Sequence, residues 1–179
     1  MFNIIQRIDE NILFFIQENL RNPVIDRVMV FISSLGDAGF LWIAIAFLLL
    51  LHKRYRKCGI VLILALMVEQ IICDDILKPL IGRVRPCNKF PDVAQLTHRM
   101  HSASFPSGHT MKGFTSATIL FIHHRPLGIG AYAIATLIGL SRLYLFVHYP
   151  SDVLAGAAFG VIVALQTIYT IRATQNMIV

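Results

Sequence analysis

The strongest constraint on the fold of this chain is a series of apolar segments that short polar or basic stretches separate. The segments cover residues 38–51, 59–76, 107–122, 127–147 and 151–171. Backbone polar groups inside lipid must be satisfied within their own segment, which favours helices. Hydrophobic residues make up 56% of the 179 residues, and the mean hydropathy of +0.66 is too high for an ordinary soluble domain. We therefore predict an all-α, polytopic membrane bundle with about five to six membrane helices.

The N-terminal region, residues 1–36, has a different pattern. Apolar residues recur there at helical spacing with polar side chains on the other face: Ile5, Ile8, Ile12 and Phe15. This predicts an amphipathic helix that either lies in the membrane interface or packs on the bundle, and both alternatives stay open. We expect a single domain, 1–179, with interfacial N-terminal helices in 1–36 and the bundle that carries the chemistry in 37–171.

The distribution of charge predicts the topology. Residues 52–57 form the densest basic cluster, and basic loops of membrane proteins stay in the cytoplasm. Because successive crossings alternate sides, loops 78–105 and 148–151 are expected on the extracytoplasmic side. The net charge of +6 lies largely beside apolar segments, so we expect membrane lipids and no nucleic acid as partners. The three cysteines are scattered, without the spacing of a zinc site or a disulfide framework.

Residues 141–152 place Arg142, His148 and Asp152 in otherwise apolar surroundings. Charged groups in such surroundings cost free energy unless they are paired or used. A guanidinium matches phosphate oxygens, and an imidazole can be a nucleophile or carry a proton. Asp152 can reach back four residues and fix the tautomer of His148. The alternative is that His148 and Asp152 only cap a membrane helix at the water interface.

The loop after segment 59–76 supplies two more cations. Six residues separate Lys78 from Arg85, and Pro86 follows Arg85 directly. Together with Arg142 they could surround a phosphoryl group and stabilise its charge. The alternative is a basic patch that binds anionic lipid headgroups.

A third stretch, Ser107, Gly108 and His109, opens the helix expected over 107–122. Backbone N–H groups at a helix N-terminus bind anions, and a histidine there can protonate a leaving oxygen. The alternative is a plain Pro-Ser-Gly turn that caps the helix.

The three stretches together match a known pattern. Lys-x6-Arg-Pro, Pro-Ser-Gly-His and Ser-Arg-x5-His-x3-Asp occur complete and in this order between residues 78 and 152. The sequence thereby resembles the type 2 phosphatidic acid phosphatase superfamily, which includes lipid phosphate phosphatases, bacterial undecaprenyl-diphosphate phosphatases and glucose-6-phosphatases. The resemblance implies the family's helical bundle and a phosphatase that requires no metal and no other cofactor.

The resemblance also implies a role for each matching position. His148 would attack phosphorus and form a phosphohistidine, and Asp152 would orient it. His109 would protonate the leaving group and then activate water. The phosphate oxygens would be held by Lys78, Arg85, Ser107, Gly108 and Arg142.

A few other side chains also give rise to predictions. Asp74 is expected to pair with Lys78, and Glu69 to face the interior of the bundle. Arg83 is expected either to contact a diphosphate or to be solvated. The residues expected to anchor the chain at the interface are Trp42, Tyr144 and Tyr149.

These observations predict a multi-pass phosphatase of the cell (cytoplasmic) membrane, acting on a lipid phosphate or diphosphate at the extracytoplasmic face. A lipid tail could remain in the bilayer while its head enters the cationic site. Undecaprenyl diphosphate is the first choice of substrate, and phosphatidic acid or phosphatidylglycerol phosphate the second. Two other possibilities stay open: a phosphatase for a soluble sugar phosphate, and a lipid-binding membrane protein without turnover.

Overall fold

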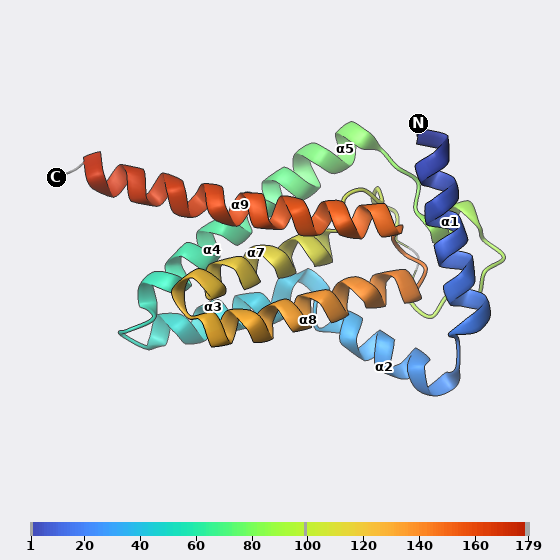
Figure 1. Cartoon of the computed structure of the whole chain (residues 1–179), viewed down its shortest axis with the longest axis horizontal. Helices are drawn as coiled ribbons and strands as arrows, with labels where there is room; N and C mark the ends of the chain where they lie inside the picture. The colour runs from blue at the N-terminus through green and yellow to red at the C-terminus, as the bar shows by residue number, and fades with distance from the viewer. Residues whose placement is uncertain (1, 99, 178–179) are drawn as a thin grey trace.

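The structure is a computed structural model that describes residues 2–98 and 100–177, and Figure 1 shows its course. The described part contains helices and no strand, which confirms the all-α prediction. The elements are α1 (Phe2–Asn19), α2 (Pro23–Ser34), a short 3-10 turn η1 (Asp37–Gly39), α3 (Phe40–Leu51), α4 (Arg56–Gln70), a π-helical stretch η2 (Ile71–Leu77), α5 (Lys78–Ile81), α6 (Pro86–Lys89), α7 (Gly108–His123), α8 (Arg125–Tyr144) and α9 (Pro150–Met177).

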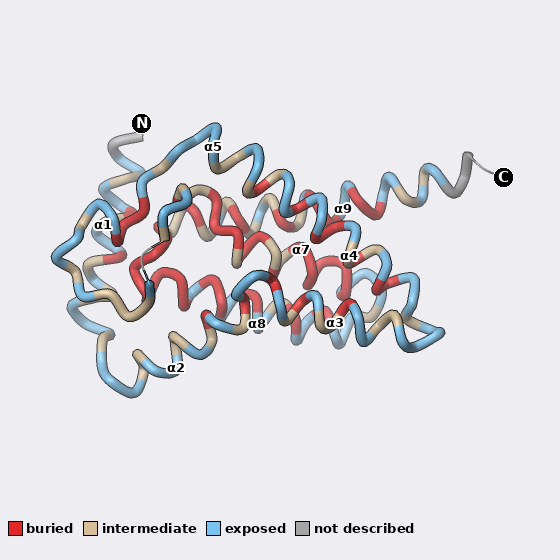
Figure 2. Tube along the Cα trace, turned by 180° about the vertical axis from the view of Figure 1, so that it is seen from behind, coloured by how far each residue is buried: buried red, intermediate tan, exposed pale blue. Residues whose placement is uncertain are grey.

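Helix α7 is the centre of the bundle. It packs along α8 and α9 and against α4, and much of it is buried (Figure 2). Two glycines of α9 allow the close approach: a Cβ on Gly156 would lie 2.7 Å from the Ser107 carbonyl oxygen, and one on Gly160 would lie 2.5 Å from that of Met111. Small residues four positions apart let helix backbones meet in this way. The contact brings the start of α7 against the start of α9, where two of the predicted motifs lie.

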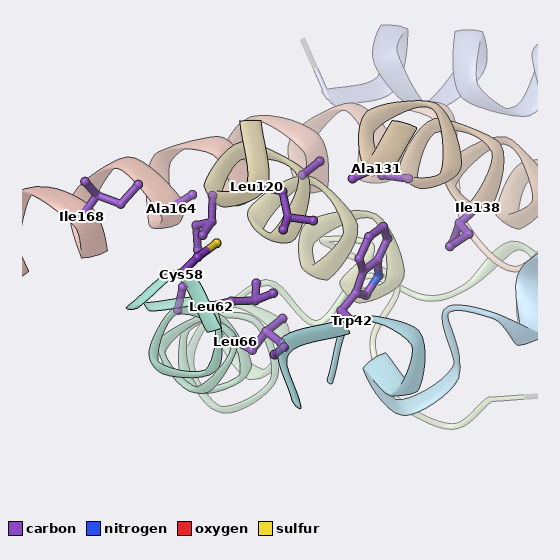
Figure 3. Packing of buried hydrophobic residues seen from close by; sticks show 14 residues of the cluster. Trp42, Cys58, Leu62, Leu66, Leu120, Ala131, Ile138, Ala164 and Ile168 are labelled. Atoms are coloured by element: carbon purple, nitrogen blue, oxygen red, sulfur yellow. The ribbon is translucent and has the colours of Figure 1, made fainter. Parts of the chain in front are cut away.

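The largest group of buried apolar side chains joins α3, α4, α7, α8 and α9 (Figure 3). Trp42 is fully buried in this core, which also contains Leu62 and Ile138. Tyr144 and Tyr149 are also buried, at 4% and 0% exposure. The prediction that these three aromatic residues anchor the chain at the interface is therefore wrong. A large aromatic ring fills a protein core as readily as a headgroup layer, and composition alone does not separate the two.

The sequence placed Lys78 in a loop after the apolar segment 59–76, but the helical structure continues to Ile81. A proline clashes with the carbonyl four residues before it in a regular α-helix. The π-helical stretch η2, directly before Lys78, widens the turn at this place. The helix stops at Gly82, whose φ of 60° lies in the left-handed region that favours glycine.

Two described helices are long and apolar enough to cross a membrane, over Arg125–Tyr144 and Pro150–Thr174. The helix pair Pro23–Ser34 and Asp37–Leu51, bent by 42°, would count as a third if it forms one broken span. The count of five to six crossings thus stays a prediction. In Figure 1 the α3–α4 and α7–α8 turns lie at one end of the bundle, and the α8–α9 turn and α1 lie at the other. The basic cluster of residues 52–57 is at the first end.

Helix α1 packs on the bundle beside α8 and α9. Among the side chains described for this helix, those of Asp9 and Leu13 are buried, and Leu13 joins an apolar cluster with Phe146 and Tyr149. The apolar stripe found in the sequence faces outward: Ile4, Ile5, Ile8, Ile12 and Phe15 are exposed. The helix therefore buries a carboxylate and exposes its apolar side, the reverse of a surface helix in water.

Candidate active site

The turn between α8 and α9, residues 145–149, carries His148 into the interior. Every residue of this turn is buried. Phe146 adopts a φ of 59°, a left-handed conformation that a bulky side chain rarely takes. Such backbone strain persists only where the surroundings hold it. Helix α9 then begins with Pro150, a residue suited to the first helical position.

Asp152 both caps a helix and faces His148, the two functions that the sequence left as alternatives. Its Oδ2 accepts a hydrogen bond of 2.9 Å from the Tyr149 backbone N–H, which caps the start of α9. The same oxygen lies 3.5 Å from Nδ1 of His148. The carboxylate is fully buried, so it faces the imidazole without water around it.

Arg85 determines the tautomer of His148. Its Nη1 lies 3.0 Å from His148 Nε2, and a guanidinium can only donate. Nε2 therefore carries the lone pair, and Nδ1 carries the proton that faces Asp152. Burial lowers the pKa of His148 to about 3, and the cations Arg85 and Arg142 act in the same direction while Asp152 opposes them. The ring is neutral at neutral pH, as a nitrogen nucleophile must be.

The remaining donors of Arg85 bind the loop between α6 and α7 and the α8–α9 turn. They bond to the carbonyl and hydroxyl of Ser102, at 2.8 and 3.0 Å, and to the carbonyls of Ala103 and Val147, at 3.3 and 3.1 Å. Arg85 is 2% exposed. One side chain thus joins the loop after α6 to the α8–α9 turn.

A cavity of about 350 Å³ connects the three motifs, and we call it the central cavity. Its lining includes Lys78, Arg85, Gly108, His109, Lys112 and His148. Lys78 is paired with Asp74, which confirms that prediction. A second cavity of about 640 Å³, the outer cavity, shares Asp74, Lys78, Arg85 and Ser102 with the first. Its lining also includes Pro79, Gly82, Arg83 and Val84.

His109 lines the central cavity and contacts the break between α2 and α3. Its Nε2 donates to Asp37 Oδ1 at 2.9 Å. The positive φ values of Ala38 and Gly39, 51° and 72°, turn the chain sharply after Asp37. Asp37 is exposed at 62% of its side chain, unlike the buried Asp152. The sequence interpretation assigned no role to Asp37, so it missed this contact.

Two predicted phosphate ligands do not line the central cavity. Ser107 is fully buried, its hydroxyl accepts from Thr110 at 2.9 Å, and its backbone N–H donates to the Asp152 carbonyl at 3.1 Å. Arg142 lines a neighbouring cavity of about 540 Å³, bonded to Ser33 and to the sulfur of Met100. Met100 itself lines the central cavity. The Nε of Arg142 is buried without a hydrogen-bond partner, which leaves one donor available.

Lys112, which lines the central cavity, pairs with the buried Glu69. The ammonium of Lys112 lies 3.2 Å from Glu69 Oε2 and 3.7 Å from Asp74 Oδ2. Glu69 is fully buried, which confirms that it faces the interior of the bundle. The sequence interpretation did not single out Lys112. Its one available signal was a lysine inside an otherwise apolar helix, one turn after His109.

Arg83 is bonded on both sides rather than solvated, so that alternative is wrong. Its guanidinium contacts Asp152 at 2.5 Å and Asp9 at 2.6 Å, and it lies 4.0 Å from the centre of the Tyr149 ring. The hydroxyl of Ser104 also donates to Asp152 Oδ2, at 2.5 Å. Neither Asp9 nor Ser104 was singled out by the sequence interpretation.

No group of three or more histidine, cysteine, aspartate or glutamate side chains in the described ranges could hold a metal ion. That the reaction needs no metal and no cofactor stays a prediction.

Comparison with known proteins gives a consistent result. The family model of the PAP2 superfamily matches residues 57–176. An undecaprenyl-diphosphatase of Sulfolobus acidocaldarius is 34% identical over 76% of this chain and 66% of its own length. Phosphatidylglycerophosphatase B of Bacillus subtilis is 35% identical over 80% of this chain and 73% of its own length.

Solved structures agree with the sequence matches. The transmembrane PAP2-type phosphatidylglycerolphosphate phosphatase of Bacillus subtilis superposes with a TM-score of 0.78 at 31% identity, covering 96% of this chain and 88% of that one. LpxE of Aquifex aeolicus superposes with a TM-score of 0.80 at 29% identity, covering 90% and 95%. The likeness thus extends beyond the matched motifs to nearly the whole helical bundle.

Proposed function

This chain belongs to the PAP2 superfamily and is a membrane lipid phosphatase, and from that premise we propose that it hydrolyses undecaprenyl diphosphate through a phosphohistidine. The observation that carries the proposal is the central cavity, where Lys78, Arg85, His109 and His148 meet. Lys78 and Arg85 can neutralise a phosphoryl group in this cavity. The two imidazoles lie in different surroundings, so one can act as the nucleophile and the other can carry the proton.

In the first step, Nε2 of His148 attacks phosphorus. The P–N bond forms as the bond from phosphorus to the leaving oxygen breaks, and His109 gives that oxygen a proton. Arg85 transfers its hydrogen bond from Nε2 to a phosphoryl oxygen, and Lys78 neutralises another. Asp152 stabilises the positive charge that develops on the ring through the proton on Nδ1.

In the second step, water attacks the phosphohistidine. His109, now neutral, takes a proton from the water, the P–N bond breaks, and inorganic phosphate leaves. His148 returns to the neutral tautomer that Arg85 and Asp152 favour. Arg142 reaches the phosphoryl group with its unpartnered Nε once Met100 moves aside.

Exposed apolar side chains in the segment between Lys78 and Arg85 support a lipid substrate. Val84 lines the outer cavity and is 58% exposed, and Leu80, in the same segment, is 76% exposed. An acyl or prenyl tail can lie along these side chains while its head enters the outer cavity. A soluble sugar phosphate has no apolar tail, so these side chains would not contribute to its binding.

A second ammonium beside Lys78 supports a diphosphate over a monophosphate. A Cβ on Gly108 would lie 3.7 Å from the Lys78 nitrogen and 3.9 Å from the Lys112 nitrogen, so both cations face the same small volume. The phosphatidylglycerol phosphate alternative is supported by the names of the Bacillus subtilis relative and structure.

The proposed side of the membrane is extracytoplasmic. The site lies at the opposite end of the bundle from the basic cluster of residues 52–57, which the positive-inside rule places in the cytoplasm. An impermeant maleimide should label His101→Cys in intact cells or spheroplasts, and Lys53→Cys only after lysis; the reverse pattern would overturn the assignment. Both positions are exposed.

The substrate is tested by phosphate release from purified protein in detergent, with His148→Ala as the inactive reference. We expect the highest kcat/KM on undecaprenyl diphosphate. A higher value on phosphatidylglycerol phosphate or phosphatidic acid would select that alternative. Equal kcat/KM on glucose 6-phosphate would refute a lipid enzyme, and no release by the unmodified protein would favour a lipid-binding protein without turnover.

A further inference from the structure

Arg83 links the N-terminal helix to the buried carboxylate beside His148. Its Nη1 donates to Asp152 Oδ1 at 2.5 Å and to the Ser151 hydroxyl at 2.7 Å. Its Nη2 donates to Asp9 Oδ2 and Gln6 Oε1, both at 2.6 Å. The guanidinium thus has one carboxylate on each side.

Asp9 is the contact that α1 makes with this region. It is 2% exposed, although it lies on a helix of 18 residues whose apolar side chains face outward. Besides Arg83, it accepts from the backbone N–H of Ser151 at 2.9 Å and from its hydroxyl at 2.5 Å. A buried carboxylate is costly unless fully bonded, so these contacts fix where α1 docks.

The orientation of Asp152 depends on which partners hold its two oxygens. Oδ2 accepts from Ser104 and from the Tyr149 backbone, and it faces His148 Nδ1. Oδ1 accepts from Arg83. With Arg83 in place, the carboxylate cannot rotate without breaking a charge-assisted bond.

Asp9 also controls how much charge remains on Asp152. A single guanidinium that faced only Asp152 would neutralise it and weaken its effect on the imidazole. Because Arg83 is shared between two carboxylates, Asp152 keeps negative charge to stabilise the ring when His148 becomes positive.

We propose that Asp9 is a positioning residue for the phosphatase reaction, acting through Arg83 on Asp152 and hence on His148. The N-terminal helix is then part of the active-site machinery, although it lies outside the segment 57–176 that matches the family. This inference rests on the proposed phosphohistidine mechanism, in which Asp152 stabilises the charged ring.

The test compares Asp9→Asn with Glu10→Gln in purified protein. Glu10 is the next residue of α1 and pairs with Lys89 at 2.5 Å, so its substitution also removes one ion pair of this helix. Glu10 makes no direct bond to Arg83, and a glutamine there keeps an oxygen that can accept from Gln6, the residue between the two. We expect kcat to fall about 10–100-fold for Asp9→Asn with KM within about 2-fold, as for outer partners of a catalytic group. Glu10→Gln should change kcat by less than about 3-fold.

A second comparison separates positioning from plain stabilisation of the fold. In an Arg83→Gln background, adding Asp9→Asn should lower kcat by less than about 3-fold, because the link is already broken. An equal loss in both backgrounds would overturn the proposal, as would equal kcat values for Asp9→Asn and Glu10→Gln.

Two controls keep the outcome clear. If Asp9→Asn does not elute as a folded protein in detergent, Arg83→Lys replaces it: lysine keeps the charge but lacks the planar fork that reaches both carboxylates. Wild-type kcat in Arg83→Lys would then refute the link. His148→Ala is measured in parallel; turnover in that variant would refute the phosphohistidine mechanism itself, whereas a failure of Asp9→Asn alone would refute only this inference.

Discussion

Replacing Asp152 by asparagine tests the arrangement around His148 most directly. The groups that face this carboxylate all have hydrogens to donate: Arg83, Ser104, the Tyr149 backbone and His148. A carboxylate can accept all of them, whereas an amide has one accepting oxygen and a nitrogen that donates. The substitution therefore creates donor–donor contacts without changing the size of the side chain.

The expected loss of kcat follows from counting the donor–donor contacts. If the amide oxygen faces Arg83, the amide nitrogen opposes the Tyr149 N–H and forces His148 to accept at Nδ1. The proton then moves to Nε2, where it opposes the Arg85 guanidinium. Each unsatisfied buried donor costs about 1–3 kcal/mol, so two such conflicts total about 2–6 kcal/mol. At about 1.36 kcal/mol per decade, kcat should fall by about 1.5 to 4 decades, that is at least about 30-fold.

The assay is phosphate release at saturating lipid substrate, with thermal unfolding in detergent to establish the folded fraction. KM should change by less than about 3-fold, because Asp152 is not among the residues lining the central cavity. Ser104→Ala is the matched control: it removes one donor and creates no conflict, so kcat should fall less than about 10-fold. A kcat within 10-fold of wild type for Asp152→Asn, in folded protein, would refute the tautomer argument.

Three further substitutions or conditions test other parts of the structure. Arg85→Lys should lower kcat/KM about 10²-fold, because lysine cannot bond the loop carbonyls and the imidazole together; a loss under 5-fold would contradict the role given to this guanidinium. Gly160→Ala should lower the detergent unfolding temperature by several degrees, since its Cβ would meet a backbone oxygen at 2.5 Å, whereas Gly130→Ala, with no atom within 4 Å, should not; equal shifts would contradict the close helix contact. Burial lowers the pKa of His148 to about 3, from about 6.5 in the unfolded chain. Because the unfolded chain binds this proton at a higher pH than the folded protein does, the free energy of unfolding falls by about 2 kcal/mol between pH 6.5 and pH 5. The unfolding temperature of wild type should therefore fall more between pH 7 and pH 5 than that of His148→Gln, and parallel falls would show that the buried ring is not the cause.

The spacing of motifs in the sequence predicted much of the site. Lys78, Arg85, His109 and His148 were selected from three stretches, and the structure places all four on one cavity. Residue type and order sufficed because each motif lies at a helix end or in a loop of the same end of the bundle. The position of the Arg142 side chain could not be predicted from the motif, because its direction depends on a bond to Ser33 in α2, 109 residues away.

The contacts that the sequence did not predict are long-range bonds between polar groups. Asp9 meets Ser151 across 142 residues, and Asp37 meets His109 across 72. The periodicity of α1 identified an apolar face and a polar face but not which side would be buried. In a membrane the apolar face can point outward, so the usual rule of amphipathic helices gives the wrong answer for Asp9.

The surroundings of the two histidines account for their different proposed tasks. His148 is 1% exposed and is held between Arg85 and the buried Asp152, so it keeps one tautomer. His109 borders the central cavity, and its partner Asp37 is 62% exposed. A nucleophile that must form a P–N bond benefits from a fixed, neutral ring, whereas a group that first gives and then takes a proton needs a partner in contact with water. Exchanging the two environments would leave the same residues in the cavity but no route for the proton, which is why the carboxylates behind the histidines matter as much as the histidines themselves.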